Sequence, residues 1–72
     1  MAQHAIENRI RDLRYARDRM TQQALAEQVG VSRQTIIAIE SGRYSPSLEV
    51  ALKIARAFDL PVDEVFSLKR PE

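Results

Sequence analysis

The sequence contains no cysteine and no tryptophan, and only two glycines and three prolines occur among its 72 residues. Without cysteine the chain can form neither disulfides nor a thiolate zinc site, so helix packing must hold the fold together and a reducing cytoplasm is the expected location. No segment approaches the roughly 18 apolar residues of a membrane span, and the N-terminus lacks a signal-like apolar stretch. We therefore expect one small cytoplasmic domain covering residues 1–72.

Histidine is also scarce, because His4 is the only one in the sequence and it lies near an N-terminus that we expect to fray. No nucleophile–base pair and no histidine-based metal cluster can be assembled around it. The neighbouring carboxylates of Asp63 and Glu64 point apart if they lie on a helix. The sequence therefore predicts a protein that is not an enzyme, with no metal, no cofactor and no small-molecule substrate.

Neither sign of charge dominates, and the formal net charge is only +1. The distribution is uneven, since residues 1–20 hold five arginines against three acids. Acids gather late in the chain, at Asp59, Asp63 and Glu64. This pattern indicates a molecule with one acidic end, and ordinary solvated faces are the alternative interpretation.

Alternating β-branched runs are absent, so the sequence predicts an all-α chain, with its helices bounded by capping residues. Apolar residues recur at Ile6, Ile10 and Leu13, which predicts a first helix over residues 5 to about 18. Thr21 is the predicted N-cap of a second helix that ends at Gly30. Ser32 is the predicted N-cap of a third helix that runs to about Ser41, with Gly42 closing it.

The second half of the chain predicts two more helices. Ser47 caps a fourth helix that ends near Asp59, and its wide apolar arc requires several neighbours, with part of its surface available for a second subunit. Pro61 begins a short fifth helix that directs Val65 and Phe66 inward. Residues 67–72 are predicted to be a frayed tail. The expected architecture is a compact five-helix domain.

The segment VGVSRQTIIAIESG, residues 29–42, separates core residues from polar ones. If Ile36 and Ile39 face the core, Arg33 and Gln34 lie in the first turn of the third helix, where free N–H groups favour phosphate. Arginine can donate two hydrogen bonds to guanine, and glutamine can bridge adenine, so the pair is suited to reading a major groove. The alternative is that both are simply good helix formers on an exposed surface.

The stretch TQQALAEQVGVSRQTIIAIESGRYSPS resembles the Cro-type phage repressor helix-turn-helix, also called the XRE family, and the match extends from Thr21 through Phe66. The resemblance implies a lambda-repressor-like DNA-binding domain. Its third helix would enter the major groove, and its second would cross above the DNA backbone. The helix-turn-helix itself would occupy residues 21–41.

The same resemblance implies which residues touch DNA. Side chains expected to contact bases are Arg33, Gln34, Thr35 and Ala38. Residues expected to contact the DNA backbone are Gln22, Ser32, Arg43 and Tyr44. Three alternatives remain open: Gln22 as a plain surface residue, Ala38 as a residue that only permits close approach, and Tyr44 as a cover for the apolar side of its loop. Ile37 is either a thymine-methyl contact or a packing residue.

The family pairs an acid at the position of Glu40 with an arginine of the first helix, for which Arg14 is the candidate. The segment YARDRM, residues 15–20, departs from the family pattern because it is one residue longer and has Arg19 in the place of a glycine. Arg17 and Arg19 are therefore either DNA-facing or solvated.

One such domain contacts few base pairs, so we expect a homodimer on a palindromic operator, with half-sites about 34 Å apart, acting as a transcriptional repressor. Candidate interface residues are Val50, Ile54, Val62, Phe66 and Leu68, and the alternative is that all five are core. The rival function is a protein-interaction module, such as an antitoxin or a restriction-modification controller, whose main role is to bind a partner protein.

Overall fold

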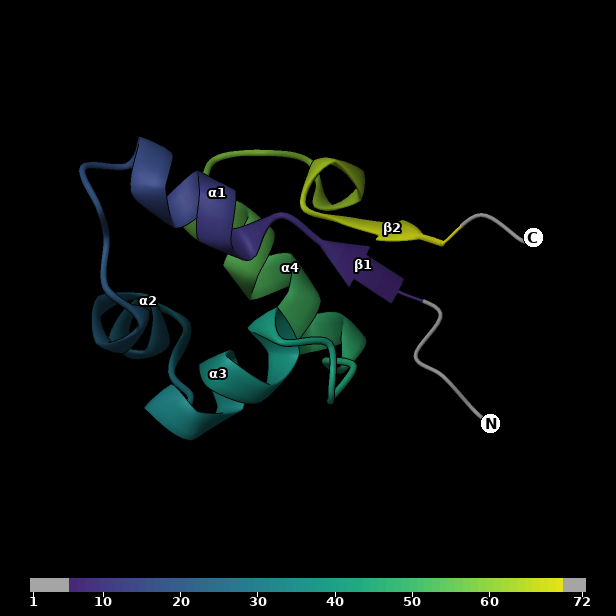
Figure 1. Cartoon of the computed structure of the whole chain (residues 1–72), viewed down its shortest axis with the longest axis horizontal. Helices are drawn as coiled ribbons and strands as arrows, with labels where there is room; N and C mark the ends of the chain where they lie inside the picture. Colours follow the sequence, from purple (N-terminus) through teal and green to yellow (C-terminus); the bar gives the residue numbers. More distant parts are fainter. Residues whose placement is uncertain (1–5, 70–72) are drawn as a thin grey trace.

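The computed structural model describes residues 6–69, and within them it contains four α-helices, a short 3-10 helix and a two-stranded antiparallel sheet (Figure 1). In chain order the elements are β1 (Ile6–Asn8), α1 (Ile10–Ala16), α2 (Gln22–Val29), α3 (Arg33–Glu40), α4 (Leu48–Ala57), the 3-10 helix η1 (Val62–Glu64) and β2 (Phe66–Leu68).

Three of the helices begin at the predicted hydroxyl caps. Thr21 Oγ1 accepts the N–H of Ala24 at 2.9 Å before α2. Ser32 and Ser47 accept in the same way, from the N–H groups three residues onward, before α3 and α4. Gly30 ends α2 with a φ of 86°, a left-handed conformation that glycine adopts without steric penalty. The predicted starts of these helices are confirmed.

The prediction of an all-α, five-helix fold is wrong at the two ends of the described chain. Residues Ile6–Asn8 form β1 instead of the first helical turn, and they pair with β2 in the register Ile6↔Leu68, Glu7↔Ser67 and Asn8↔Phe66. Ser67 and Leu68 therefore belong to a strand and not to a frayed tail. The predicted fifth helix is reduced to the three residues of η1. His4 and residues 70–72 lie outside the described residues.

Asn8 explains why α1 starts late. Its side-chain oxygen accepts the N–H of Ile10 at 3.1 Å, and its amide donates to the carbonyl of Ile39 at 2.9 Å, at the end of α3. The N–H of Arg9 donates to the carbonyl of Val65 at 2.9 Å. Because asparagine side chains compete with helical hydrogen bonding, these contacts divert the chain into the sheet before the helix begins.

A single apolar core joins all four α-helices. Its buried residues are Ile10, Leu25, Ala26, Val29, Ile36, Ile39, Ile54, Ala55, Phe58 and Val65. The wide apolar arc of α4 is only partly covered, since Leu48 and Leu52 are 73% and 50% exposed. The core therefore fixes α3 against α2 and α4 from one side and leaves its opposite side exposed (Figure 1).

Candidate nucleic-acid interface

Helix α3 separates anchoring from exposed side chains. Ile36 and Ile39 are 0% and 1% exposed, so they fix one face of the helix in the core. Arg33 and Gln34 in the first turn are exposed, whereas Thr35 and Ala38 are half-buried at the edges of the same outer face. Gln34 and Ala38 lie one turn apart on the side of α3 that faces away from the core, with Arg33 and Thr35 on its two flanks.

The first turn of α3 is held by the Ser32 cap. Ser32 Oγ accepts the N–H of Thr35 at 3.1 Å and also lies 2.9 Å from Thr35 Oγ1, so the two hydroxyls share a hydrogen bond. Both side chains have lone pairs left for a further partner. The cap orients the exposed first turn without covering it.

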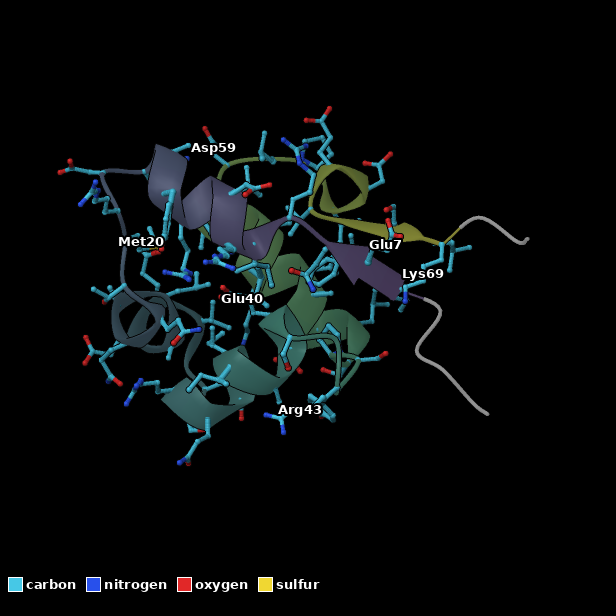
Figure 2. All side chains as sticks on the ribbon, viewed as in Figure 1. Glu7, Met20, Glu40, Arg43, Asp59 and Lys69 are labelled. Carbon is cyan, nitrogen blue, oxygen red and sulfur yellow. The ribbon has the colours of Figure 1, made fainter. Side chains whose placement is uncertain are left out.

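A nearly buried ion pair joins α3 to α1. Arg14 donates from Nε to Glu40 Oε1 at 3.1 Å and from Nη2 to Glu40 Oε2 at 2.8 Å, and the two side chains are 9% and 11% exposed. Arg14 Nη1 also donates to the carbonyl of Met20 at 2.8 Å. Figure 2 shows Glu40 at the centre of the view, among α1, α2 and α3. The predicted pairing of Arg14 with Glu40 is confirmed.

Gln22 extends this network to α2. Its amide Nε2 donates to Glu40 Oε1 at 3.4 Å, and the residue is half-buried at the first position of α2. Gln22 is therefore held by the last residue of α3. It lies beside the free N–H groups at the amino end of α2, and these groups are a suitable site for a phosphate oxygen.

The loop after α3 exposes a second cation. Arg43 is exposed, and its Nε donates to Ser41 Oγ at 3.2 Å, while the Ser41 hydroxyl donates to the Ala38 carbonyl at 3.1 Å. Figure 2 shows Arg43 at the lower edge of the molecule beside α3. Tyr44 is 51% exposed and also lines a small hollow with Pro46, so its ring partly covers the loop and partly faces solvent.

The comparisons with known proteins agree with this arrangement. The helix-turn-helix family HTH_3 matches residues 13–65. This chain belongs to the Cro/XRE-type helix-turn-helix family. Members of this family are DNA-binding transcriptional regulators and not enzymes.

One relative of this XRE-family chain is YgzD of Bacillus subtilis, which is named an uncharacterized HTH-type transcriptional regulator. YgzD is 48% identical to this chain over 64 residues, which cover 89% of this chain and 96% of YgzD. The cryptic phage CTXphi transcriptional repressor RstR of Vibrio cholerae is 40% identical over 60 residues, 83% of this chain and 53% of RstR. The crystal structure titled "a putative DNA-binding protein from Bacteroides fragilis" matches this chain with a TM-score of 0.75 at 31% sequence identity. The match covers 86% of this chain and 98% of that one.

Two polar residues of this XRE-family protein have structural roles that the sequence did not reveal. Asn8 connects β1 to the end of α3 and accepts a hydrogen bond from the first residue of α1. An asparagine shortly before a run of periodic apolar residues is a helix-start signal, so the second of these contacts could have been found from the sequence. Arg17 is exposed, and its Nη2 donates to the Phe58 carbonyl at 2.6 Å, so Arg17 connects the end of α1 to the end of α4. Nothing in the sequence around Arg17 indicates this distant acceptor.

The candidate dimer residues occupy different environments. Ile54 is 0% exposed, so it has no surface for a second subunit, and the prediction that it contacts one is wrong for this conformation. Val50, Val62 and Phe66 are half-buried, and Leu68 is 75% exposed. Within the described part of the chain, no helix has the length and apolar character needed to cross a membrane.

Proposed function

We propose that this chain represses transcription by binding a palindromic operator as a homodimer. The observation that best supports this proposal is the exposure of Arg33 and Gln34 at the amino end of α3. Ile36 and Ile39 fix the opposite face of the helix in the core. In the major groove the two exposed side chains would donate to guanine and adenine edges, with Thr35 and Ala38 beside them. The name of the relative RstR supports a repressor role.

Contacts with phosphates would position the amino end of α3 on the DNA. Gln22 and Ser32 lie at the amino ends of α2 and α3, and Arg43 and Tyr44 lie in the loop after α3, so the four residues flank the exposed face of α3 on both sides. Contacts of this kind fix the register of the domain on the duplex and carry no sequence information themselves.

A second copy would supply the second half-site. The described domain has principal extents of 35 × 21 × 21 Å, so two copies side by side can present their α3 helices about 34 Å apart, one turn of DNA. We assign the contact to Val50, Val62, Phe66 and Leu68, because Leu68 is an exposed leucine at the end of β2 and the other three are only half-covered.

Selection of bound duplexes from a random pool tests this function. We expect a symmetric consensus with two half-sites, and binding to that consensus whose affinity falls linearly with salt on logarithmic axes. A pool that yields no enriched sequence, or binding that ignores salt, would instead favour the rival role of a protein-interaction module.

A further inference from the structure

The turn between α1 and α2 holds an arginine in a strained conformation. Asp18 and Arg19 have φ angles of 60° and 59°, in the left-handed region that residues other than glycine, asparagine and aspartate rarely adopt. The family resemblance places a glycine at the position of Arg19. A strained residue persists where the surrounding structure holds it, and such residues cluster at functional sites. The positive φ of Arg19 therefore makes its side chain a candidate for a functional role.

Arg19 lines a depression of about 660 Å³ between α1 and the amino end of α2. We call this depression the arginine groove and define it by Arg11, Arg14, Arg19, Thr21, Gln22 and Glu40. An adjoining depression of about 430 Å³ shares Arg11, Gln22 and Glu40 with it and continues to Ile37 and Ser41 of α3. The two depressions together lead from the α1–α2 turn to the side of α3.

The arginine groove has an excess of positive charge. Its one carboxylate, Glu40, is paired with Arg14. Among residues 6–69 the other ion pair within 4.0 Å joins Lys53 to Glu49, so Arg11 and Arg19 have no carboxylate partner there. Both guanidinium groups belong to exposed residues, and that of Arg11 lies over the Tyr15 ring at 5.9 Å. These two arginines are therefore available to an anion.

The groove also borders the exposed face of α3. Ile37 and Ser41 lie one and two turns after Arg33 on the same side of the helix, and both line the adjoining depression. When α3 enters a major groove, the preceding helix crosses the DNA backbone, which brings a phosphate strand to the amino end of α2. That end, with Thr21 and Gln22, forms one wall of the arginine groove.

We propose that Arg19, together with Arg11, binds a phosphate of the operator strand that passes over the amino end of α2. This inference rests on the proposed function and adds to it two DNA-contacting residues that the family motif does not contain. It also gives a physical reason for an arginine at a left-handed position: the backbone conformation of the turn directs a cation into the groove beside Gln22.

The test compares Arg19→Gly with Asp18→Gly on the selected duplex, by fluorescence anisotropy at several salt concentrations. Both substitutions place glycine at a positive φ, so both variants should fold with at least wild-type thermal stability. Arg19→Gly should bind about three- to tenfold more weakly at low salt, equally for all duplex sequences, and its log–log salt slope should be smaller by about 1. Asp18→Gly should retain the wild-type slope.

Arg33→Ala distinguishes a failure of the arginine groove proposal from a failure of the proposed function. If Arg33→Ala relaxes base preference while Arg19→Gly matches Asp18→Gly in affinity and slope, the arginine groove proposal is overturned and the proposed function stands. If the wild-type chain binds no duplex in a salt-dependent way, both are overturned.

Discussion

Glu40 shows how one residue can fix the orientation of α3, the helix that we propose reads DNA. Its two carboxylate oxygens accept three hydrogen bonds, two from Arg14 and one from Gln22, and so connect α3 to both preceding helices. Burying two charges has a desolvation penalty that largely offsets their attraction, so such a pair determines geometry more than net stability. The effect of losing one partner is much larger, because the other charge is then left unpaired.

We predict that Glu40→Ala lowers the free energy of unfolding by about 3 kcal/mol, because the nearly buried Arg14 guanidinium loses its carboxylate. Glu40→Gln should have a smaller effect, since the amide oxygen still accepts one hydrogen bond from Arg14. Urea denaturation measures both variants. A Glu40→Ala protein as stable as the wild type would show that the pair does not hold α3.

At the scale of elements, the three helices with hydroxyl caps could be predicted, whereas the start of α1, the reduced fifth helix and the sheet could not. Helices α2, α3 and α4 each begin at a Thr or Ser whose capping chemistry is local, and Gly30 marks the turn by its conformational freedom. Strands β1 and β2 have three residues each and pair opposite ends of the described chain, so no local pattern specifies them. The spacing of Ile6 from Ile10 imitates a helix, although Ile6 lies on β1.

The same distinction applies to the candidate interface. The exposure of Arg33 and Gln34 follows from the Ser32 cap and the spacing of Ile36 and Ile39, which are both visible in the sequence. The arginine groove depends on the left-handed turn at Arg19 and on the position of α1 relative to the amino end of α2, which only the three-dimensional structure supplies.

A comparison of two helix caps separates folding from DNA contact. Glycine at an N-cap lowers stability by only a few tenths of a kcal/mol relative to serine, so Ser32→Gly and Ser47→Gly should both remain close to the wild type in thermal denaturation. Only Ser32→Gly removes a hydroxyl from the proposed interface, and we predict about a fivefold loss of duplex affinity for it, equivalent to one neutral hydrogen bond. Equal affinities for the two variants would contradict a phosphate contact by Ser32.

At the scale of the whole molecule, the order of charges in the sequence predicts one acidic end. Figure 2 shows Arg43 at the lower edge beside α3 and Asp59 at the opposite edge, near the end of α4. Asp59, Asp63 and Glu64 are exposed on the side of η1. Arg9 and Arg17 donate to the carbonyls of Glu64 and Phe58, so this side of the molecule also carries positive charge, and the acidic end stays a prediction.

The proposed dimer is also a property of the whole molecule. We predict that the double substitution Val62→Glu and Leu68→Glu shifts the chain to a monomer in sedimentation experiments, because it places like charges on both sides of the proposed contact. Leu48→Glu is the matched control, since Leu48 is 73% exposed on α4 and lies outside that contact. Dissociation by Leu48→Glu alone would move the interface to the outer flank of α4.

Competition binding of wild type and Arg33→Ala to all single-base variants of the selected operator tests most directly whether the amino end of α3 reads bases. We predict that Arg33→Ala loses about 1–3 kcal/mol of binding free energy on the consensus, with discrimination lost at one base pair of each half-site and kept at the others. An Arg33→Ala protein with wild-type affinity and unchanged preference at every position would contradict base reading by the amino end of α3.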